Sequence, residues 1–196
     1  MTVALPGKRK LDWPAAFLSY LLPGLGQIVQ GRIGKGVLYF ICLYGLFFYG
    51  LSMGSWKNVW LGDYGQQTDV QVVGRKLPGV LKDLSYRREF AGQFWIGIAA
   101  WPAVVQYQTT EPIPKSEDPG KESWQPKENR LFGAYMQVPP EAELNKLQRD
   151  GDKRWDLGWV FTVIAGVLNI LVIYDALAGP VVRDEDDKVK PAGGAA

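Results

Sequence analysis

The chain has 196 residues, of which 47% are hydrophobic and 21% are charged, and its formal net charge is +2. It contains no histidine and a single cysteine, Cys42. These counts exclude Ser-His-Asp and Cys-His catalysis, histidine-ligated zinc or haem, and an internal disulfide. The net charge is small and the basic residues are scattered among acidic ones, so the sequence does not indicate nucleic-acid binding. We therefore predict no enzyme, no cofactor, no metal and no nucleic-acid partner.

Charged residues are segregated along the chain. Four windows contain no Asp, Glu, Lys or Arg: residues 13–31, 36–56, 90–110 and 157–174, with lengths of 19, 21, 21 and 18. A helix rises about 1.5 Å per residue, so each window is long enough, or nearly so, to cross a hydrocarbon core of about 30 Å. The predicted fold class is an all-α membrane protein with about four transmembrane helices, the first two a tight hairpin, joined by irregular polar loops.

The N-terminal part is predicted to be a leader followed by a hairpin. Residues 1–12 are polar, and their basic residues resemble the charged region of a signal peptide, but no Ala-x-Ala cleavage signature follows. We therefore expect a retained first helix in a transmembrane hairpin over residues 13–54. Pro23 and Gly24 interrupt its first arm, which should kink there or form a shallow re-entrant segment, because proline removes a backbone donor. The short linker at 31–36 turns the chain back.

Residues 37–53 are apolar around the whole circumference of a helix, which is typical of a segment that faces lipid or a core. This segment ends in a small-x-x-x-small spacing at Gly50 and Gly54, which permits close approach of another helix. Trp56 and Trp60 follow at the position of an interfacial aromatic belt.

The third predicted membrane segment is interrupted by helix-breaking residues, whereas the fourth is continuous. Residues 90–107 contain Gly97 and Pro102, so we predict a kinked or tilted span, with a re-entrant loop as the alternative. Residues 157–178 form the predicted fourth transmembrane helix, of which 157–177 alone would span about 31 Å at the standard rise. Its small residues favour close packing against another helix. These residues, at a spacing of four, form a narrow ridge along the helix: Gly158, Thr162, Gly166 and Ile170, with Ala165 and Asn169 beside it.

The remaining segments are polar. Residues 55–89 form a loop, 108–156 a proline-rich extramembrane loop, and 179–196 a disordered tail. Within the loops we predict short strands at 70–73 and 131–138 and helices at 78–88 and 141–149.

Four polar side chains lie at or near membrane depth. Gln27, Gln93 and Asn169 need partners in hydrocarbon, so we expect them to face one another or the bundle interior, either bonding between helices or lining a polar path. Asp175 ends the fourth helix, where the helix dipole disfavours an anion. It is predicted to be solvated, paired with Arg183, Arg32 or Lys35, or used for transport or binding. The candidate site comprises Gln27, Gln93, Asn169, Asp175, Gly158, Thr162 and Gly166.

The topology follows from the positive-inside rule. If all four windows span, both termini share one side with residues 57–89, and that side carries 12 Lys and Arg against 10 on the opposite side. Basic residues near span ends favour the cytoplasmic side. We predict cytoplasmic termini, with residues 106–156 on the other side.

Two resemblances extend this interpretation. The run Leu22-Pro23-Gly24-Leu25-Gly26-Gln27, followed by Gly31-Arg32 and Gly34-Lys35-Gly36, resembles the two-transmembrane-helix domain over roughly residues 10–54. The stretches Gly92–Gly97 and Leu157–Pro180 resemble an uncharacterised, planctomycete-type family of bacterial polytopic membrane proteins. The second resemblance implies a polytopic membrane protein and no particular activity.

The leading hypothesis is a multi-pass protein of the bacterial inner (cytoplasmic) membrane that acts structurally or assembles partners through helix packing. Its partners would be the lipid bilayer and either copies of itself or another membrane protein. The alternative is a subunit of a small oligomeric transporter or channel. An enzymatic hypothesis would need carboxylates such as Glu141 and Glu143, whose setting is typical of a solvated helix face.

Overall fold

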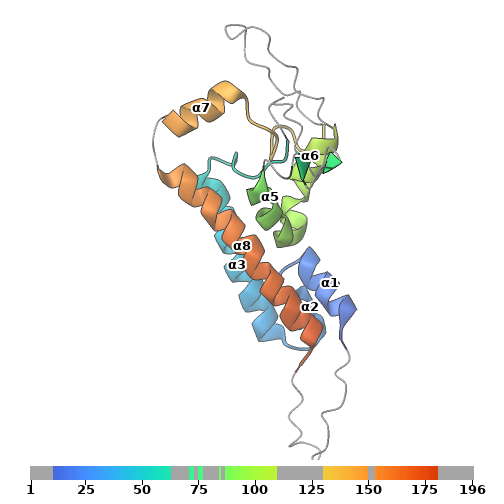
Figure 1. Cartoon of the computed structure of the whole chain (residues 1–196). Helices are drawn as coiled ribbons and strands as arrows, with labels where there is room; N and C mark the ends of the chain where they lie inside the picture. Colours follow the sequence, from blue (N-terminus) through green and yellow to red (C-terminus); the bar gives the residue numbers. More distant parts are fainter. Residues whose placement is uncertain are drawn as a thin grey trace, which may run out of the picture.

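The computed structural model of the protein describes residues 11–62, 71–72, 75–76, 84, 87–109, 130–149 and 153–180. The helices are α1 (Trp13–Leu21), α2 (Leu25–Val29), α3 (Ile33–Met53), α5 (Arg88–Gln93), the 3₁₀ helix η1 (Phe94–Ala100), α6 (Trp101–Thr109), α7 (Glu141–Arg149) and α8 (Lys153–Ala178). Two-residue strands, β1 (Gln71–Val72) and β2 (Arg75–Lys76), pair antiparallel. The predicted helical fold class is therefore confirmed (Figure 1).

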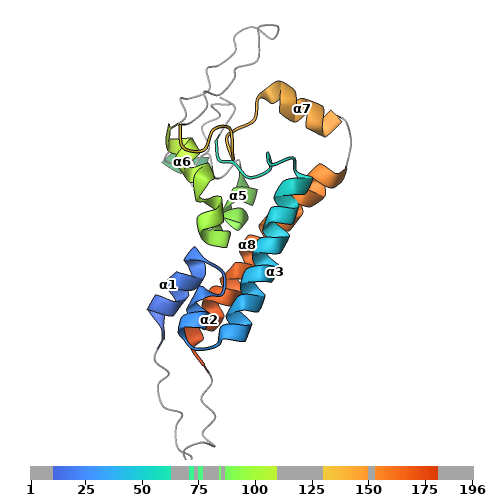
Figure 2. The ribbon, with the colours of Figure 1, turned by 180° about the vertical axis from the view of Figure 1, so that it is seen from behind.

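Two long helices form the axis of the molecule. In both views α3 and α8 run side by side, and the short helices α1, α2 and α5 pack against them, while α7 stands away from the pair (Figures 1 and 2). With 21 and 26 residues, they are the two helices of the described part of the chain that are long and apolar enough to cross a membrane. The expectation of four such helices is wrong. The reason is that the first and third uncharged windows are each broken into short pieces.

The first window breaks at Pro23 and Gly24. Helix α1 ends at Leu21 and α2 begins at Leu25, and between them Gly24 has φ 86°, a left-handed conformation that favours glycine. The nine residues of α1 rise only about 14 Å at the standard pitch, roughly half of a hydrocarbon core. The expected interruption is present, and the hairpin of two full spans is not.

The third window breaks at Gly97, whose φ of 85° and ψ of −136° separate the pieces of η1. A Cβ atom on Gly97 would lie 1.9 Å from the carbonyl oxygen of Tyr20 and 2.6 Å from that of Leu21. Only glycine permits this approach, so the turn in the third window sits directly against the C-terminal end of α1. The third window is therefore not the kinked, continuous span that the sequence predicts. It is interrupted, as the first window is, and the two interrupted segments meet at Gly97.

The described parts of the two polar loops meet at one end of the α3–α8 pair, whereas the predicted topology places these loops on opposite sides of the membrane. Three contacts join them: the ion pair of Lys57 with Glu143, the Trp56–Tyr135 ring contact at 6.2 Å, and a hydrogen bond of 2.9 Å from Gln106 Nε2 to the Gly133 carbonyl. Helix α1 starts at the opposite end of the pair. There the Asp12 amide donates to the carbonyl of Leu177, near the end of α8, at 2.9 Å. The third window turns at Gly97, and its far end, in α6, lies beside the described loop residues through the bond from Gln106 to Gly133.

The ridge of small residues on α8 packs as a helix interface, except at one position. Gly158, Thr162, Ala165, Gly166 and Asn169 are buried, and a Cβ on Gly158 would lie 2.5 Å from the Gly50 carbonyl oxygen of α3. Ile170 is 38% exposed instead. A spacing of four drifts around a helix that has about 3.6 residues per turn, so the buried stripe continues through Val172 and Ala176.

The remaining expectations have mixed outcomes. Helix α7 occupies the predicted residues 141–149, and β1 lies within 70–73. The predicted strand at 131–138 is wrong, because this segment forms turns in which Gly133 and Met136 have positive φ. Most of the predicted helix at 78–88, and nearly all of the N-terminal leader and the C-terminal tail, lie outside the described residues.

Candidate functional site

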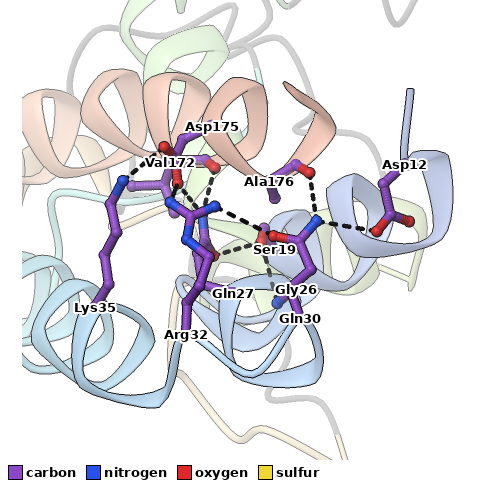
Figure 3. A network of polar contacts seen from close by, with 10 residues as sticks. All are labelled: Asp12, Ser19, Gly26, Gln27, Gln30, Arg32, Lys35, Val172, Asp175 and Ala176. Atoms are coloured by element: carbon purple, nitrogen blue, oxygen red, sulfur yellow. Dashed lines mark hydrogen bonds and ion pairs between the residues drawn. The ribbon is translucent and has the colours of Figure 1, made fainter. Parts of the chain in front are cut away.

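Asp175 is the centre of a polar network at the end of the α3–α8 pair (Figure 3). Its Oδ2 accepts from Arg32 Nη2 at 2.5 Å, and its Oδ1 accepts from Lys35 Nζ at 2.6 Å. The structure thus pairs Asp175 with two of the three cations that the sequence offers. Their positive charges compensate an anion placed at the C-terminal end of α8, where the helix dipole is unfavourable.

Gln27 ties this ion pair to the broken first segment. Its Nε2 donates to Asp175 Oδ2 at 3.1 Å and to the Val172 carbonyl at 2.8 Å. Its Oε1 accepts from Ser19 Oγ at 3.0 Å, and the same hydroxyl accepts from the Gly26 amide at 3.1 Å. Gln27 and Ser19 are fully buried, and each is satisfied by the other and by the backbone.

Gln30 repeats the pattern one turn later. Its Nε2 donates to Asp12 Oδ2 at 3.0 Å and to the Ala176 carbonyl at 2.7 Å, while its Oε1 accepts from Arg32 Nη1 at 3.3 Å. We call the connected set the Asp175 network; it consists of Asp12, Ser19, Gln27, Gln30, Arg32, Lys35 and Asp175 (Figure 3).

The local sequence explains why these residues converge. Gln27 and Gln30 lie three apart at the end of α2, and Arg32 and Lys35 lie three apart at the start of α3, so each pair shares a helix face. The two helices touch closely, because a Cβ on Gly24 would lie 2.0 Å from the Gly36 carbonyl oxygen. Both pairs therefore point at the same stretch of α8.

Asp12 caps α1 and should make the fold sensitive to acid. Its Oδ1 accepts from the Ala15 amide at 3.1 Å. The hydrogen bond from Gln30, and then the one from Ala15, hold the pKa of the Asp12 carboxyl below its ordinary value. A depressed pKa contributes stability above the unfolded value, near 4, and that contribution is lost as the pH falls through the folded value.

We therefore expect the thermal midpoint of the wild type to fall more steeply below about pH 4 than that of Asp12→Asn, which cannot titrate. Thermal unfolding in detergent from pH 6 to pH 3 measures both slopes. Identical slopes for the two proteins would remove Asp12 from the acid response.

A second buried polar group, the Gln93 cluster, consists of Asn58, Gln93 and Thr162. Gln93 Nε2 donates to the Asn58 carbonyl at 3.1 Å and to Thr162 Oγ1 at 2.7 Å. Asn58 Nδ2 donates to the Gly50 carbonyl at 3.0 Å. The cluster joins the end of α3, the end of α5 and the first half of α8.

Asn169 connects the two broken segments between these polar groups. Its Nδ2 donates to the Ser19 carbonyl of α1 at 3.2 Å and to the Trp95 carbonyl of η1 at 2.8 Å. Asn169 is fully buried. Gln27, Gln93 and Asn169 thus all point inward, but each bonds to its own partners and none to another of the three.

A model of a family of unknown function, DUF6677, matches residues 14–189. The chain belongs to this family. No curated protein and no solved structure matches it. The resemblance to an uncharacterised family is therefore confirmed at that level, and the DUF6677 match brings no activity with it. The planctomycete type and the two-transmembrane-helix resemblance stay predictions.

In this DUF6677 protein, the carboxylates of Asp175 and Glu143 are already paired with cations. Both oxygens of Asp175 are engaged by cations, and Glu143 pairs with Lys57 at the surface. Among the described residues, no group of three His, Cys, Asp or Glu side chains could hold a metal ion. The polar side chains described above form hydrogen bonds and ion pairs that join different segments of the chain.

Sequence reasoning missed four residues of these polar groups: Asp12, Ser19, Gln30 and Asn58. Asp12 carries a detectable signal, since an Asp directly before a helical run that opens with proline is a typical N-cap. The other three carry none, because their partners are set by packing between distant segments.

Proposed function

We propose that this protein is a non-enzymatic, multi-pass integral membrane protein of the bacterial cytoplasmic membrane. Helices α3 and α8 cross the bilayer, and the two broken segments enter it from opposite faces and meet at Gly97. Its role is structural: it assembles with copies of itself or with another membrane protein through helix packing.

The observation that carries the proposal is the outward surface of the two long helices. Only 28% of the apolar window of α3 and 33% of that of α8 is buried within the chain, whereas a core helix of a soluble protein is buried for most of its length. Large apolar side chains on these helices face outward, among them Leu38, Ile41, Tyr49, Ile164, Val167 and Leu171. A surface of this kind needs an apolar solvent or an apolar partner.

The polar side chains of the interior support the same proposal. In hydrocarbon every polar group needs an internal partner. Gln27, Gln93 and Asn169 are each bonded to carbonyls of neighbouring segments, and Asp175 lies at a helix end, beside cations. The segregation of outward apolar and inward polar side chains is typical of a membrane bundle.

If α3 and α8 are the two spans, the side of the membrane on which each loop and each terminus lies is fixed. Residues 55–87 and 110–152 share one side, and both termini share the other. The majority of 12 to 10 that favoured cytoplasmic termini disappears, because 14 Lys and Arg then stand on the loop side, counting Arg88, Lys153 and Arg154 at the adjoining helix starts, and eight on the side of the termini. Reporters inserted after residues 65 and 120 should report the same side, and a reporter at the C-terminus the opposite side. Opposite readings at 65 and 120 would restore four spans.

The assembly role is tested by affinity purification from native membranes followed by native mass measurement. We expect the tagged chain to carry either further copies of itself or a co-purifying membrane protein at a fixed ratio. A monodisperse monomer without a co-purifying chain would contradict the assembly role but leave the membrane assignment in place.

A second candidate function is a subunit of a small transporter or channel. It is favoured by two fully buried polar side chains on one face of α8, Thr162 and Asn169, and by the partly exposed Asp175 near the end of the same helix. Interrupted helices that meet within the bilayer are a common way to build a substrate or ion path. One chain has too few helices to enclose a pore, so this function requires an oligomer. Flux of a small ion or solute into proteoliposomes, abolished by Asn169→Leu, would favour it over the structural role.

A further inference from the structure

Within the described part of the chain, four buried amide oxygens without a hydrogen-bond donor lie in or beside the second broken segment. This segment comprises α5, η1 and α6, residues 88–109. The oxygens belong to Asn58, Gln93, Gln106 and Asn169, each at most 2% exposed. Gln93 and Gln106 are part of the segment, and the other two residues bond to it through the Asn58 carbonyl and the Asn169 amide. A buried acceptor without a donor costs free energy, because its lost hydration is not replaced.

The four amides cannot be turned around to satisfy these oxygens. In Asn58, Gln106 and Asn169, the nitrogen already faces backbone carbonyls at distances between 2.8 and 3.2 Å. In Gln93 it faces the Asn58 carbonyl and Thr162 Oγ1, whose own proton is donated to a backbone carbonyl. Rotating any of these amides would bring oxygen against oxygen, so the acceptors without donors are fixed.

The first broken segment, residues 13–30, is held to α8 by amides that are satisfied at both ends. Gln27 Oε1 accepts from Ser19, and Gln30 Oε1 accepts from Arg32. The nitrogens of both glutamines donate to carbonyls of α8. Asn169 touches both segments, because its nitrogen also donates to the Ser19 carbonyl. The two broken segments thus differ in how completely their own amides are bonded.

This difference changes what each segment loses when it moves away from α8. Helices α5 and η1 both pack against α8 (Figure 2). Separating them from it admits water to amide oxygens that have no donor in the closed fold, so hydration offsets part of the lost contacts. Separating the first segment breaks bonds that are already complete, together with the contact of Gln27 with Asp175. Elements that open locally are drawn from the least stable part of a fold.

We propose that the second broken segment is the opening element of this protein. It separates from α8 as one unit, while the first broken segment stays docked. When it is open, water reaches Thr162 and Asn169 from the end at which the polar loops meet, and the Asp175 network keeps the opposite end closed. The proposal depends on burial and hydrogen bonding, and it goes beyond the structural role because it gives the bundle a closed and an open state.

The test is hydrogen–deuterium exchange of the full-length wild type in lipid nanodiscs, resolved by mass spectrometry and corrected for intrinsic exchange rates. We expect the backbone amides of residues 88–109 to exchange at least about tenfold faster than those of residues 13–30. Peptides from α5 and α6 should share one rate, because the segment opens as a unit. Equal or slower exchange in residues 88–109, or separate rates for α5 and α6, would overturn the proposal.

A matched pair of variants tests the cause. Gln27→Met and Gln93→Met replace fully buried glutamines by a side chain of similar length. Gln27→Met should speed exchange in residues 13–30 severalfold, because it breaks a completely bonded amide. Gln93→Met removes an unpaired oxygen along with its bonds, so exchange in residues 88–109 should change by less than about twofold. A Gln93→Met variant that is more strongly affected than Gln27→Met, or that alone fails to fold, would contradict the proposal.

Discussion

Gly166→Ala is expected to destabilise the bundle strongly. A Cβ at this position would lie 2.0 Å from the Gly92 carbonyl oxygen and 3.2 Å from the Cα of Gln93. Both neighbours are backbone atoms of α5, so no side-chain rotation relieves the clash. Helix α5 must move away from α8, and the bond of Gln93 to Thr162 is lost with it. Overpacking of a core typically costs about 1–3 kcal/mol, and the lost bond of a buried amide adds about 1 kcal/mol or more.

Gly45→Ala is the matched control for this prediction. Gly45 lies in the middle of α3 and is exposed, and a Cβ added there would meet no atom of another segment within 4 Å. Alanine there removes only the intrinsic penalty of glycine in a helix, about 1 kcal/mol in water. Yield of monodisperse protein in detergent and its thermal midpoint compare the two variants. A Gly166→Ala variant with the wild-type midpoint would contradict the packing of α5 on α8.

Asp175→Asn is expected to destabilise the protein by about 1–3 kcal/mol, the range for hydrogen bonds to charged groups after allowance for solvent. The neutral amide cannot compensate Arg32 and Lys35 together, so two cations are left side by side at the end of α8. The side chains of Arg32, Lys35 and Asp175 are 19%, 40% and 29% exposed, and water therefore screens part of the loss. The contact between the start of α3 and α8 should loosen, because Arg32 and Lys35 both reach that helix through the carboxylate.

Glu143→Gln provides the comparison for Asp175→Asn. It removes the same charge from an ion pair with Lys57 whose side chains are 37% and 38% exposed and which has no buried amide attached. A surface pair of this kind contributes less than about 1 kcal/mol. Thermal unfolding in detergent measures both variants. Equal, small losses would show that the Asp175 network is a surface pair and does not hold the segments together.

The long helices were predictable, and the broken ones were only partly so. Runs of 21 and 18 uncharged residues correspond to α3 and α8, because absence of charge and helical length are both visible in a window of sequence. The first and third windows are equally free of charged residues, yet Gly24 and Gly97 adopt left-handed conformations that interrupt them. Proline and glycine indicated where a break occurs. Whether the chain then continues across or turns back depends on contacts with other segments.

The candidate site was also only partly predictable from the sequence. The inward direction of Gln27, Gln93 and Asn169 was predictable, because an unpaired polar group in hydrocarbon is costly. A single polar residue within an apolar window is enough to make this prediction. The pairing of Asp175 with cations at the start of α3 also follows from charge and position. Ser19 and Asn58 could not be found, because their roles depend on the local fold around α2 and the end of α3.

The topology prediction failed for a related reason. The positive-inside rule counts charges on alternate sides, so its result depends on the number of spans. With four spans, the loop that starts at Lys57 and the one that contains Glu143 fall on opposite sides, whereas the structure pairs these two residues. A change in the number of crossings therefore also changes the orientation that the rule predicts.

The environment of Cys42 tests most directly whether lipid is the solvent of the outward helix faces. This residue is the only cysteine of the chain, and it is exposed on α3. Thiols react with maleimides as thiolates, which form in water and not in hydrocarbon. A charged maleimide applied to opened native membranes should leave Cys42 unmodified but label Leu131→Cys, whose native side chain is 79% exposed in a polar loop. After denaturation in SDS, Cys42 should label fully. Labelling of native Cys42 as fast as that of the loop cysteine would place α3 in water and contradict the membrane assignment.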